Sequence, residues 1–234
     1  MLADWKVDVA GLKKAVDGFD GFSIVYFVNP NNPTSTVTPA SEIELWVKSK
    51  PDNTLFIADE AYAEYVSDPN FKSMANLIQD GLDNVVLLKT FSKLYAMAGM
   101  RVGFAVGAPA IIKMMKDQVA GEKLNYPGVT AALVSLDDEP FQEYSRASNL
   151  ESRKILASCF DKLGVKYLPS STNFMFFELN EPIHAFQKKM AARNILVGRP
   201  FPPAMTWCRI SLGTPQEMAY VANELTKMRA EGVF

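Results

Sequence analysis

The sequence has 234 residues, of which 48% are hydrophobic and 21% are charged, an ordinary composition for a globular protein. A net charge of −2 and an isoelectric point of about 5.6 argue against nucleic acid or an anionic membrane as the main partner. The first residues lack the apolar stretch of a signal peptide, and no apolar run approaches the roughly 18 residues of a membrane-spanning helix.

Short apolar runs alternate with helical patterns in the first part of the chain. Four runs are predicted as strands: residues 22–28, 54–59, 84–90 and 100–107. Between the first two, residues 39–50 place Ile43, Trp46 and Val47 at helical spacing. Strand–helix–strand order with continuous apolar strands predicts an α/β fold, a mostly parallel sheet covered by helices.

Two helices follow these strands, at residues 109–121 and 140–164, and the second is predicted to end at Gly164. After it the predicted strands are short: residues 165–170, 172–179, 195–198 and 207–213, with a helix at 182–193. This pattern predicts a small α+β domain at the C-terminal end of the chain.

The last helix, residues 214–232, carries its own start signal. Thr214 stands at the N-cap, Pro215 at the first helical position and Glu217 at the third, which is a capping-box pattern. The change from long to short elements predicts a large domain at 1–149, including its connecting helices, and a small domain at 150–234.

Residues that hold metals or form hydrolytic triads are scarce. Cys159 and Cys208 are the only cysteines and lack metal-type spacing, which favours a reduced compartment such as the cytoplasm. His184 is the only histidine, and its helical pattern favours a surface position. We therefore expect no metal site and no Ser-His-Asp triad.

Polar side chains follow the first two strands, where open α/β sheets place their ligands. Asn32 lies in "NPNNPT", and Pro33 holds it in extended geometry, although Asn-Pro is also common in plain turns. Asp59 ends the second strand and begins "DEAYAEY", with Tyr62 three residues on. The simpler reading there is an acidic helix start with an aromatic core residue.

The third and fourth strands enclose "TFSK". A buried or cation-flanked lysine such as Lys93 can serve as an amine nucleophile, with the hydroxyls of Thr90 and Ser92 beside it. Arg101 offers a planar fork suited to phosphate. The simpler reading is a solvated loop. Arg209, in the late run "CRISLG", needs an anion, either a ligand carboxylate or a local acid.

Together these groups describe a pyridoxal phosphate site, in which a lysine forms a Schiff base and a partner binds the pyridine nitrogen. The motifs "NPNNPT", "DEAYAEY" and "TFSKLYAMAGMRVGF", in this order, resemble the fold-type I pyridoxal phosphate-dependent aminotransferases of class I/II. The closest resemblance is to the histidinol-phosphate aminotransferase branch. It extends over essentially the whole chain, including "TNFMFFEL" and "WCRISLGT".

The resemblance implies a role for each of these residues. Lys93 is the Schiff-base lysine; Asp59 pairs with the pyridine nitrogen; Tyr62 and Asn32 bind the ring 3-oxygen; Thr90, Ser92 and Arg101 hold the phosphate; Arg209, helped by Asn173, binds the substrate carboxylate. The implied reaction is transamination between an amino acid and a 2-keto acid in a cytoplasmic homodimer, with Lys93 as general base and acid.

Two departures from the family pattern stand out. Ser35 replaces the usual glycine after "NPT", which is expected to loosen one turn. The usual N-terminal portion of the large domain, with its glycine-rich phosphate turn and ring-stacking aromatic, has no counterpart upstream of "NPNNPT". The chain is therefore expected to be either a shortened enzyme or a fragment whose missing part lies elsewhere. A shortened enzyme is expected to have a more open pocket, which holds the cofactor weakly and accepts a broad range of substrates. An amino-acid racemase or decarboxylase on the same scaffold, or a non-catalytic fragment, remain alternatives.

Overall fold

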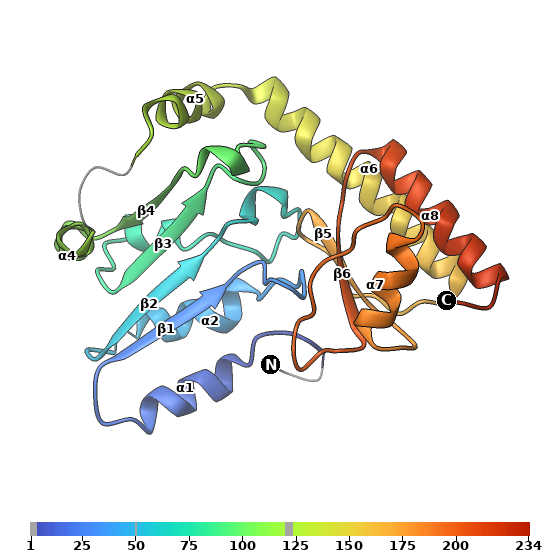
Figure 1. Ribbon diagram of the computed structural model, residues 1–234. Coiled ribbons are helices and arrows are strands. Elements are labelled where there is room, and N and C mark those ends of the chain that lie inside the picture. The colour runs from blue at the N-terminus through green and yellow to red at the C-terminus, as the bar shows by residue number, and fades with distance from the viewer. Residues whose placement is uncertain (1–3, 50, 120–123) are drawn as a thin grey trace. The chain divides into compact units, whose positions relative to one another are not determined.

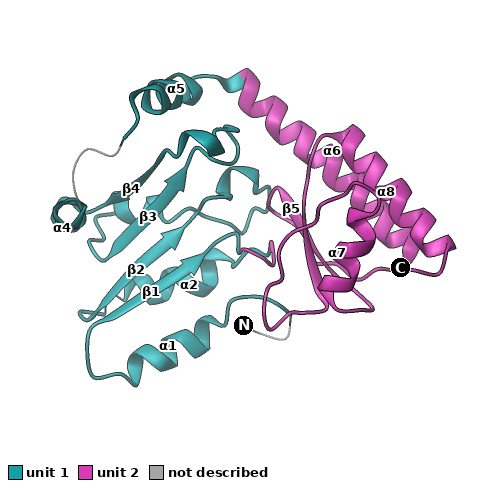
Figure 2. Cartoon of the chain, in the orientation of Figure 1, with its two compact units in different colours: residues 1–31, 36–139 teal, residues 32–35, 140–234 magenta. Residues whose placement is uncertain are grey.

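The computed structural model describes residues 4–49, 51–119 and 124–234 (Figure 1). The chain forms two compact units, which Figure 2 colours separately. Unit 1 comprises residues 1–31 and 36–139, and unit 2 comprises residues 32–35 and 140–234. The domain division at residue 150 stays a prediction.

Unit 1 is an α/β unit built from the first elements of the chain. They are α1 (Val9–Asp17), β1 (Ser23–Val28), α2 (Ala40–Lys48), β2 (Thr54–Asp59), η1 (Ala63–Tyr65), α3 (Ala75–Gln79), β3 (Val85–Thr90), η2 (Ala98–Met100), β4 (Gly103–Gly107), α4 (Pro109–Gln118) and α5 (Tyr126–Leu136). In the part of the chain that the structure describes, no helix is both long enough and apolar enough to cross a membrane.

The four strands of unit 1 form one sheet in the order β1-β2-β3-β4 (Figure 1). The pairs β1·β2 and β2·β3 are parallel, and β3·β4 is antiparallel, so the predicted mostly parallel sheet is confirmed. The fourth strand begins three residues later than predicted, at Gly103. The preceding residues form the 3₁₀ turn η2, and Arg101 adopts a left-handed conformation with φ 54°, which interrupts extended backbone.

One face of this sheet packs against α1, α2 and α3. Phe56 on β2 is fully buried, and its ring meets the ring of Trp46 on α2 edge-on with centroids 4.9 Å apart. The other buried members of this core are Val9, Val25, Phe27, Ile43, Val47, Ala58, Met74, Leu77, Val85 and Leu87. This packing fixes the strands whose carboxyl ends carry the candidate site.

The other face of β1 is open. Ile24 and Tyr26 are 60% and 54% exposed, and they alternate with the buried Val25 and Phe27. In the parallel register Tyr26 lies opposite Ile57, so its side chain shares a face with the residue two positions further along β2, Asp59. The first strand therefore presents a tyrosine beside the carboxylate that ends the second.

Unit 2 is a small α+β unit. Its elements are α6 (Glu139–Leu163, whose first residue belongs to unit 1), β5 (Phe174–Glu178), α7 (Ile183–Ala191), β6 (Trp207–Ser211) and α8 (Pro215–Ala230). Strands β5 and β6 are antiparallel, and their buried side chains pack with those of the three helices. The predicted capping box is confirmed, because Thr214 accepts from the Glu217 N–H and the Glu217 side chain accepts from the Thr214 N–H.

Two predicted strands of unit 2 are wrong. Residues 165–170 make one isolated bridge, from Tyr167 to Phe177 on β5, and Pro169 offers no N–H with which to extend it. Residues 195–198 are irregular, and the Gly198 N–H donates to the Arg209 carbonyl at 3.2 Å. A Cβ on Gly198 would lie 2.6 Å from that carbonyl oxygen, so glycine permits this close approach.

A buried ion-pair network lies directly after β2. The Glu60 carboxylate, 2% exposed, accepts from the Ser73 hydroxyl and the Met74 N–H, each at 2.7 Å. The Lys89 Nζ lies 3.5 Å from Glu60 and 2.7 Å from Glu64. Burial raises the pKa of Glu60, although the hydrogen bonds and Lys89 oppose this. Lys89 therefore supplies positive charge that a buried carboxylate requires.

Replacing Lys89 by methionine is expected to lower the free energy of unfolding by about 2–3 kcal/mol at neutral pH, because it leaves Glu60 buried without its cation. In the variant, the pKa of Glu60 in the folded state should lie further above its unfolded value than it does in the wild type, because Lys89 no longer opposes the effect of burial. Stability should accordingly fall as pH rises above the ordinary glutamate pKa of 4.5. Urea titrations at several pH values measure both effects.

The control for this variant is Lys113→Met, which breaks an exposed pair with Asp117 on α4. It should cost less than about 0.5 kcal/mol and show no added pH slope. Equal losses in Lys89→Met and Lys113→Met would contradict the assigned role of the buried network.

Candidate active site

Asp59 ends β2 on the edge where parallel strands finish, which is where open α/β sheets bind ligands. Its Oδ1 accepts from the Ala61 N–H at 3.0 Å, and its Oδ2 accepts from the Tyr26 hydroxyl at 2.6 Å. The side chain is half-buried. Asp59 thus presents a carboxylate of fixed orientation at the carboxyl edge of the sheet.

Sequence reasoning missed Tyr26. Burial, the hydrogen bond donated to Asp59 and the charge of Asp59, in that order of size, raise the pKa of the Tyr26 phenol to about 12 from its ordinary value of 10.0. All three causes disfavour the phenolate. The two residues are 33 positions apart in the sequence, and only the register of the folded strands brings them together.

The substitution Asp59→Asn is expected to lower the pKa of Tyr26 from about 12 toward 10.0, because it removes the anion and weakens the accepted hydrogen bond while burial remains. NMR titration of ¹³C-labelled tyrosine measures this pKa. Asp52→Asn, in an exposed turn of the same unit, should leave it unchanged. A Tyr26 pKa that stays at about 12 in Asp59→Asn would show that the contact is not the cause.

Lys93 lies in the turn after β3 and is half-buried. Its Nζ is 5.3 Å from the ring centroid of Tyr62, whose side chain is 5% exposed, which is a cation–π distance. The Lys93 carbonyl accepts from the Ala96 N–H at 3.0 Å and closes the turn. The structure therefore brings the predicted lysine and tyrosine together, with the amine over the aromatic face.

The three predicted phosphate ligands lie around the same turn. The Thr90 hydroxyl accepts from the Ser92 N–H at 3.1 Å and donates to the Val102 carbonyl at 3.4 Å. Arg101 is exposed, and its Nη1 donates to the Ala98 carbonyl at 2.8 Å. The Thr90 hydroxyl and the Arg101 guanidinium thus make local backbone contacts, and the phosphate-binding role of these residues stays a prediction.

Unit 2 brings together two candidates that are 177 residues apart in the sequence. The Arg209 Nη1 donates to Asn32 Oδ1 at 2.8 Å. The Arg209 guanidinium lies 4.9 Å from the ring centroid of Phe174 and 5.2 Å from that of Phe201. Asn173 directly precedes β5, and its carbonyl accepts from the Leu212 N–H at 2.9 Å. The guanidinium is therefore oriented by aromatic faces and an amide oxygen.

The loop that carries Asn32 is strongly constrained. Within unit 1 the Asn29 side chain bonds the backbone N–H and carbonyl of Thr38, at 2.9 and 3.0 Å, a role that sequence reasoning missed. Within unit 2 Ser35 is fully buried with φ 62°, a conformation that favours glycine. The Ser35 carbonyl accepts from the Ser171 N–H at 3.1 Å. The serine turn that was expected to be loose is held by this contact.

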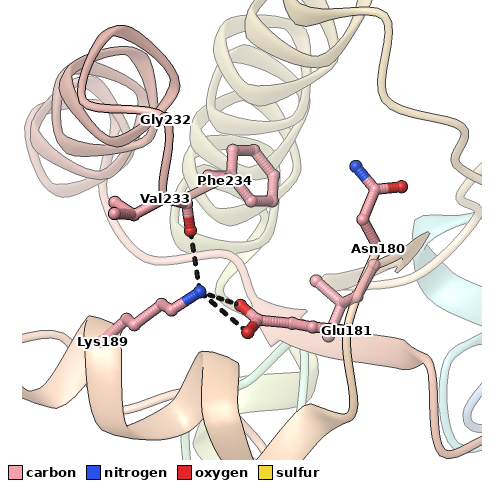
Figure 3. Close-up of a pocket in the computed structure, with 7 residues that line it drawn as sticks. Asn180, Glu181, Lys189, Gly232, Val233 and Phe234 are labelled. Atoms are coloured by element: carbon pink, nitrogen blue, oxygen red, sulfur yellow. Dashed lines mark hydrogen bonds and ion pairs between the residues drawn. The ribbon is translucent and has the colours of Figure 1, made fainter.

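A separate pocket of about 250 Å³ lies in unit 2 (Figure 3). The Lys189 Nζ donates to the two carboxylate oxygens of Glu181 at 2.8 and 2.7 Å and to the Val233 carbonyl at 2.9 Å. Glu181 neutralises this lysine, so Lys189 is already paired and does not mark an anion site. His184, on the same helix α7, is exposed, as predicted.

The site residues lie in motifs that the sequence profile named "Aminotransferase class I and II" also covers, since this profile matches residues 2–225. The chain belongs to this family. It is 33% identical over 236 residues to a histidinol-phosphate aminotransferase of Symbiobacterium thermophilum, covering 99% of this chain and 63% of that aminotransferase.

Solved structures share the fold. A crystal structure from Erwinia carotovora atroseptica is 54% identical with a TM-score of 0.98, covering 100% of this chain and 68% of that one. The histidinol-phosphate aminotransferase of Sinorhizobium meliloti, in complex with pyridoxal-5′-phosphate, is 26% identical with a TM-score of 0.87, covering 98% of this chain and 63% of that one. The predicted fold of the pyridoxal phosphate-dependent transferases is confirmed. The chain spans about half to two thirds of the length of the curated aminotransferases it matches.

Proposed function

We propose that the protein is a pyridoxal phosphate-dependent aminotransferase that moves an amino group between an amino acid and a 2-keto acid. The observation that carries this proposal is the placement of Asp59 at the end of β2 and of Lys93 just after β3, on adjacent parallel strands. A carboxylate and an amine at one sheet edge match the pyridine nitrogen and the aldehyde of this cofactor.

The chemistry of the donors in unit 1 fits pyridoxal phosphate. The Asp59 carboxylate suits a cationic ring N–H, and the Lys93 amine suits the aldehyde. Thr90, Ser92 and Arg101 carry hydroxyl and guanidinium groups of the kind that bind phosphate. The cofactor supplies, when bound, the electron sink that stabilises negative charge at the substrate α-carbon.

The residues of the chain supply the remaining functions. Asp59 holds the proton on the ring nitrogen, and the Nζ of Lys93, as general base and acid, takes the proton from the α-carbon of the amino acid. The side-chain Oδ1 of Asn32 already accepts from Arg209, so its side-chain NH₂ is the group that suits the ring 3-oxygen, together with the Tyr62 hydroxyl. Arg209 binds the α-carboxylate of the substrate through two parallel hydrogen bonds, and Asn173, just before β5, contributes to the same binding.

The proposal includes a cytoplasmic homodimer that acts on small amino and keto acids. A reduced compartment is supported by the two cysteines of unit 2, because Cys159 and Cys208 are both buried free thiols. Burial raises the pKa of each thiol. The dimer is proposed from the family resemblance.

Incubation of the purified chain with pyridoxal phosphate, an L-amino acid and a 2-keto acid tests the proposal. The expected result is amine transfer that depends on the keto acid, measured as a new amino acid by chromatography. Loss of carbon dioxide or formation of the D-amino acid, without keto-acid dependence, would instead support a decarboxylase or a racemase. A chain that takes up no pyridoxal phosphate would contradict the proposal altogether.

A further inference from the structure

Two hydrogen bonds, from donors on different sides, orient the Asp59 carboxylate in unit 1. The Ala61 N–H reaches Oδ1 from the backbone two residues on, and the Tyr26 hydroxyl reaches Oδ2 from the adjacent strand. One donor on each oxygen fixes both side-chain torsions of the aspartate. A carboxylate accepts at about four lone-pair positions, so both oxygens keep capacity for a ligand.

The second of these bonds comes from Tyr26, whose backbone lies in a strand that is anchored on both sides of this residue. Its neighbours on β1, Val25 and Phe27, are 5% and 4% exposed and anchor the strand in the core. Tyr26 is 54% exposed, so its side chain is not a member of the core. The side chain makes a 2.6 Å hydrogen bond from its hydroxyl to Asp59.

We infer that Tyr26 is a positioning residue, which holds the Asp59 carboxylate in the orientation that accepts the N–H of a cationic pyridine ring. The inference rests on the proposed function, because it gives that ring as the ligand of Asp59. The Tyr26 phenol is protonated at neutral pH, so its hydroxyl is available to donate to the Asp59 carboxylate. Tyr26 itself touches neither the substrate nor the reacting carbon in this assignment.

The competing explanation is a hydrogen bond that only stabilises the fold. The two explanations differ in what the ligand ring must contain. If Tyr26 positions Asp59 for a ring N–H, its loss should weaken only those ligands that have the ring nitrogen. If Tyr26 stabilises the fold, its loss should weaken every ligand of the site to the same extent.

The test compares pyridoxal phosphate with its 1-deaza analogue, which has C–H in place of the ring nitrogen. Tyr26→Phe removes the hydroxyl and keeps the ring, and it is expected to raise the dissociation constant of pyridoxal phosphate about tenfold. The dissociation constant of the analogue should change by less than about twofold. Absorbance titration measures both constants without any turnover. Tyr126→Phe, on an 82% exposed tyrosine of α5, is the matched control and should change neither.

A double-substitution cycle with Asp59→Asn completes the test. Asp59→Asn alone should weaken pyridoxal phosphate more than Tyr26→Phe does, because it removes the accepting anion. Tyr26→Phe should then add no further loss in the Asp59→Asn chain. A full additional tenfold loss in that background would overturn the inference.

The outcomes separate the inference from the proposed function. Equal weakening of both ligands by Tyr26→Phe, or no weakening of either, overturns the positioning role while a strong Asp59→Asn effect still supports the proposed function. Binding of pyridoxal phosphate that is indifferent to Asp59→Asn overturns the cofactor role of Asp59, and the Tyr26 inference with it.

Discussion

Lys93→Ala is expected to abolish amine transfer, with a loss of at least about 10⁴-fold in kcat, since one side chain supplies both the amine that attaches the cofactor and the general base. The amine sits in the turn after β3, over the Tyr62 ring at 5.3 Å. Alanine leaves this position without any nucleophile. The folding of unit 1 should survive, because Lys93 is half-buried in a turn and is not a member of the sheet core.

Two measurements make this result specific to Lys93. Borohydride treatment of the wild-type chain with pyridoxal phosphate should fix the label on the peptide that contains Lys93, and mass spectrometry locates it. The control Lys116→Ala, at an exposed lysine of α4, should keep full labelling and full activity. Labelling that persists at another lysine in Lys93→Ala, together with near-normal turnover, would contradict the assignment.

The long and strongly patterned elements of the fold could be predicted from the sequence. Strands β1, β2 and β3 are continuous apolar runs, and α8 begins with a capping box, so local chemistry was sufficient. Helix α3 has five residues, too few for a helical period to appear. Helix α5 is apolar around most of its circumference, which hides the stripe of an amphipathic helix.

Helix α1, like α3 and α5, was not predicted from the sequence, although the sequence does contain a helix-capping residue and helical spacing for it. Asp8 caps it by accepting from the Gly11 N–H at 2.8 Å, and Val9, Leu12 and Val16 contribute to the core of unit 1 at helical spacing. The wrongly predicted strand at 195–198 shows the opposite limit. An apolar run there resembles a strand, but whether it pairs depends on tertiary contacts that no local pattern contains.

The candidate site divides in the same way. Asp59 and Lys93 follow predicted strands, so the rule that ligands bind at the carboxyl ends of parallel strands made them candidates, and the family resemblance gave them their roles. The partners that orient the side chains could not be selected. Tyr26 reaches Asp59 across the strand register, and Asn32 reaches Arg209 across 177 residues, so each contact exists only after folding.

Arg209→Leu is expected to lower kcat/KM for an amino acid by about 10³-fold, or about 4 kcal/mol of transition-state stabilisation. The guanidinium lies over Phe174 and Phe201, and Asn32 fixes one of its nitrogens. A fork held in this way binds a carboxylate with little loss of side-chain entropy. Arg209→Lys should recover only part of the loss, since a lysine ammonium cannot make the two parallel bonds.

The ligand identifies the role of Arg209. With an amine donor that lacks the α-carboxylate, wild-type and Arg209→Leu chains should react at similar low rates, because the interaction partner has been removed from the substrate. The control is Arg199→Leu. Arg199 lies 4.3 Å from the centroid of the same Phe201 ring but donates to the Pro200 carbonyl, so its loss should change kcat/KM by less than about threefold. Cofactor absorbance should stay unchanged in both variants. An Arg209→Leu loss of the same size for the amine without a carboxylate would show that Arg209 supports the fold of unit 2 rather than the substrate.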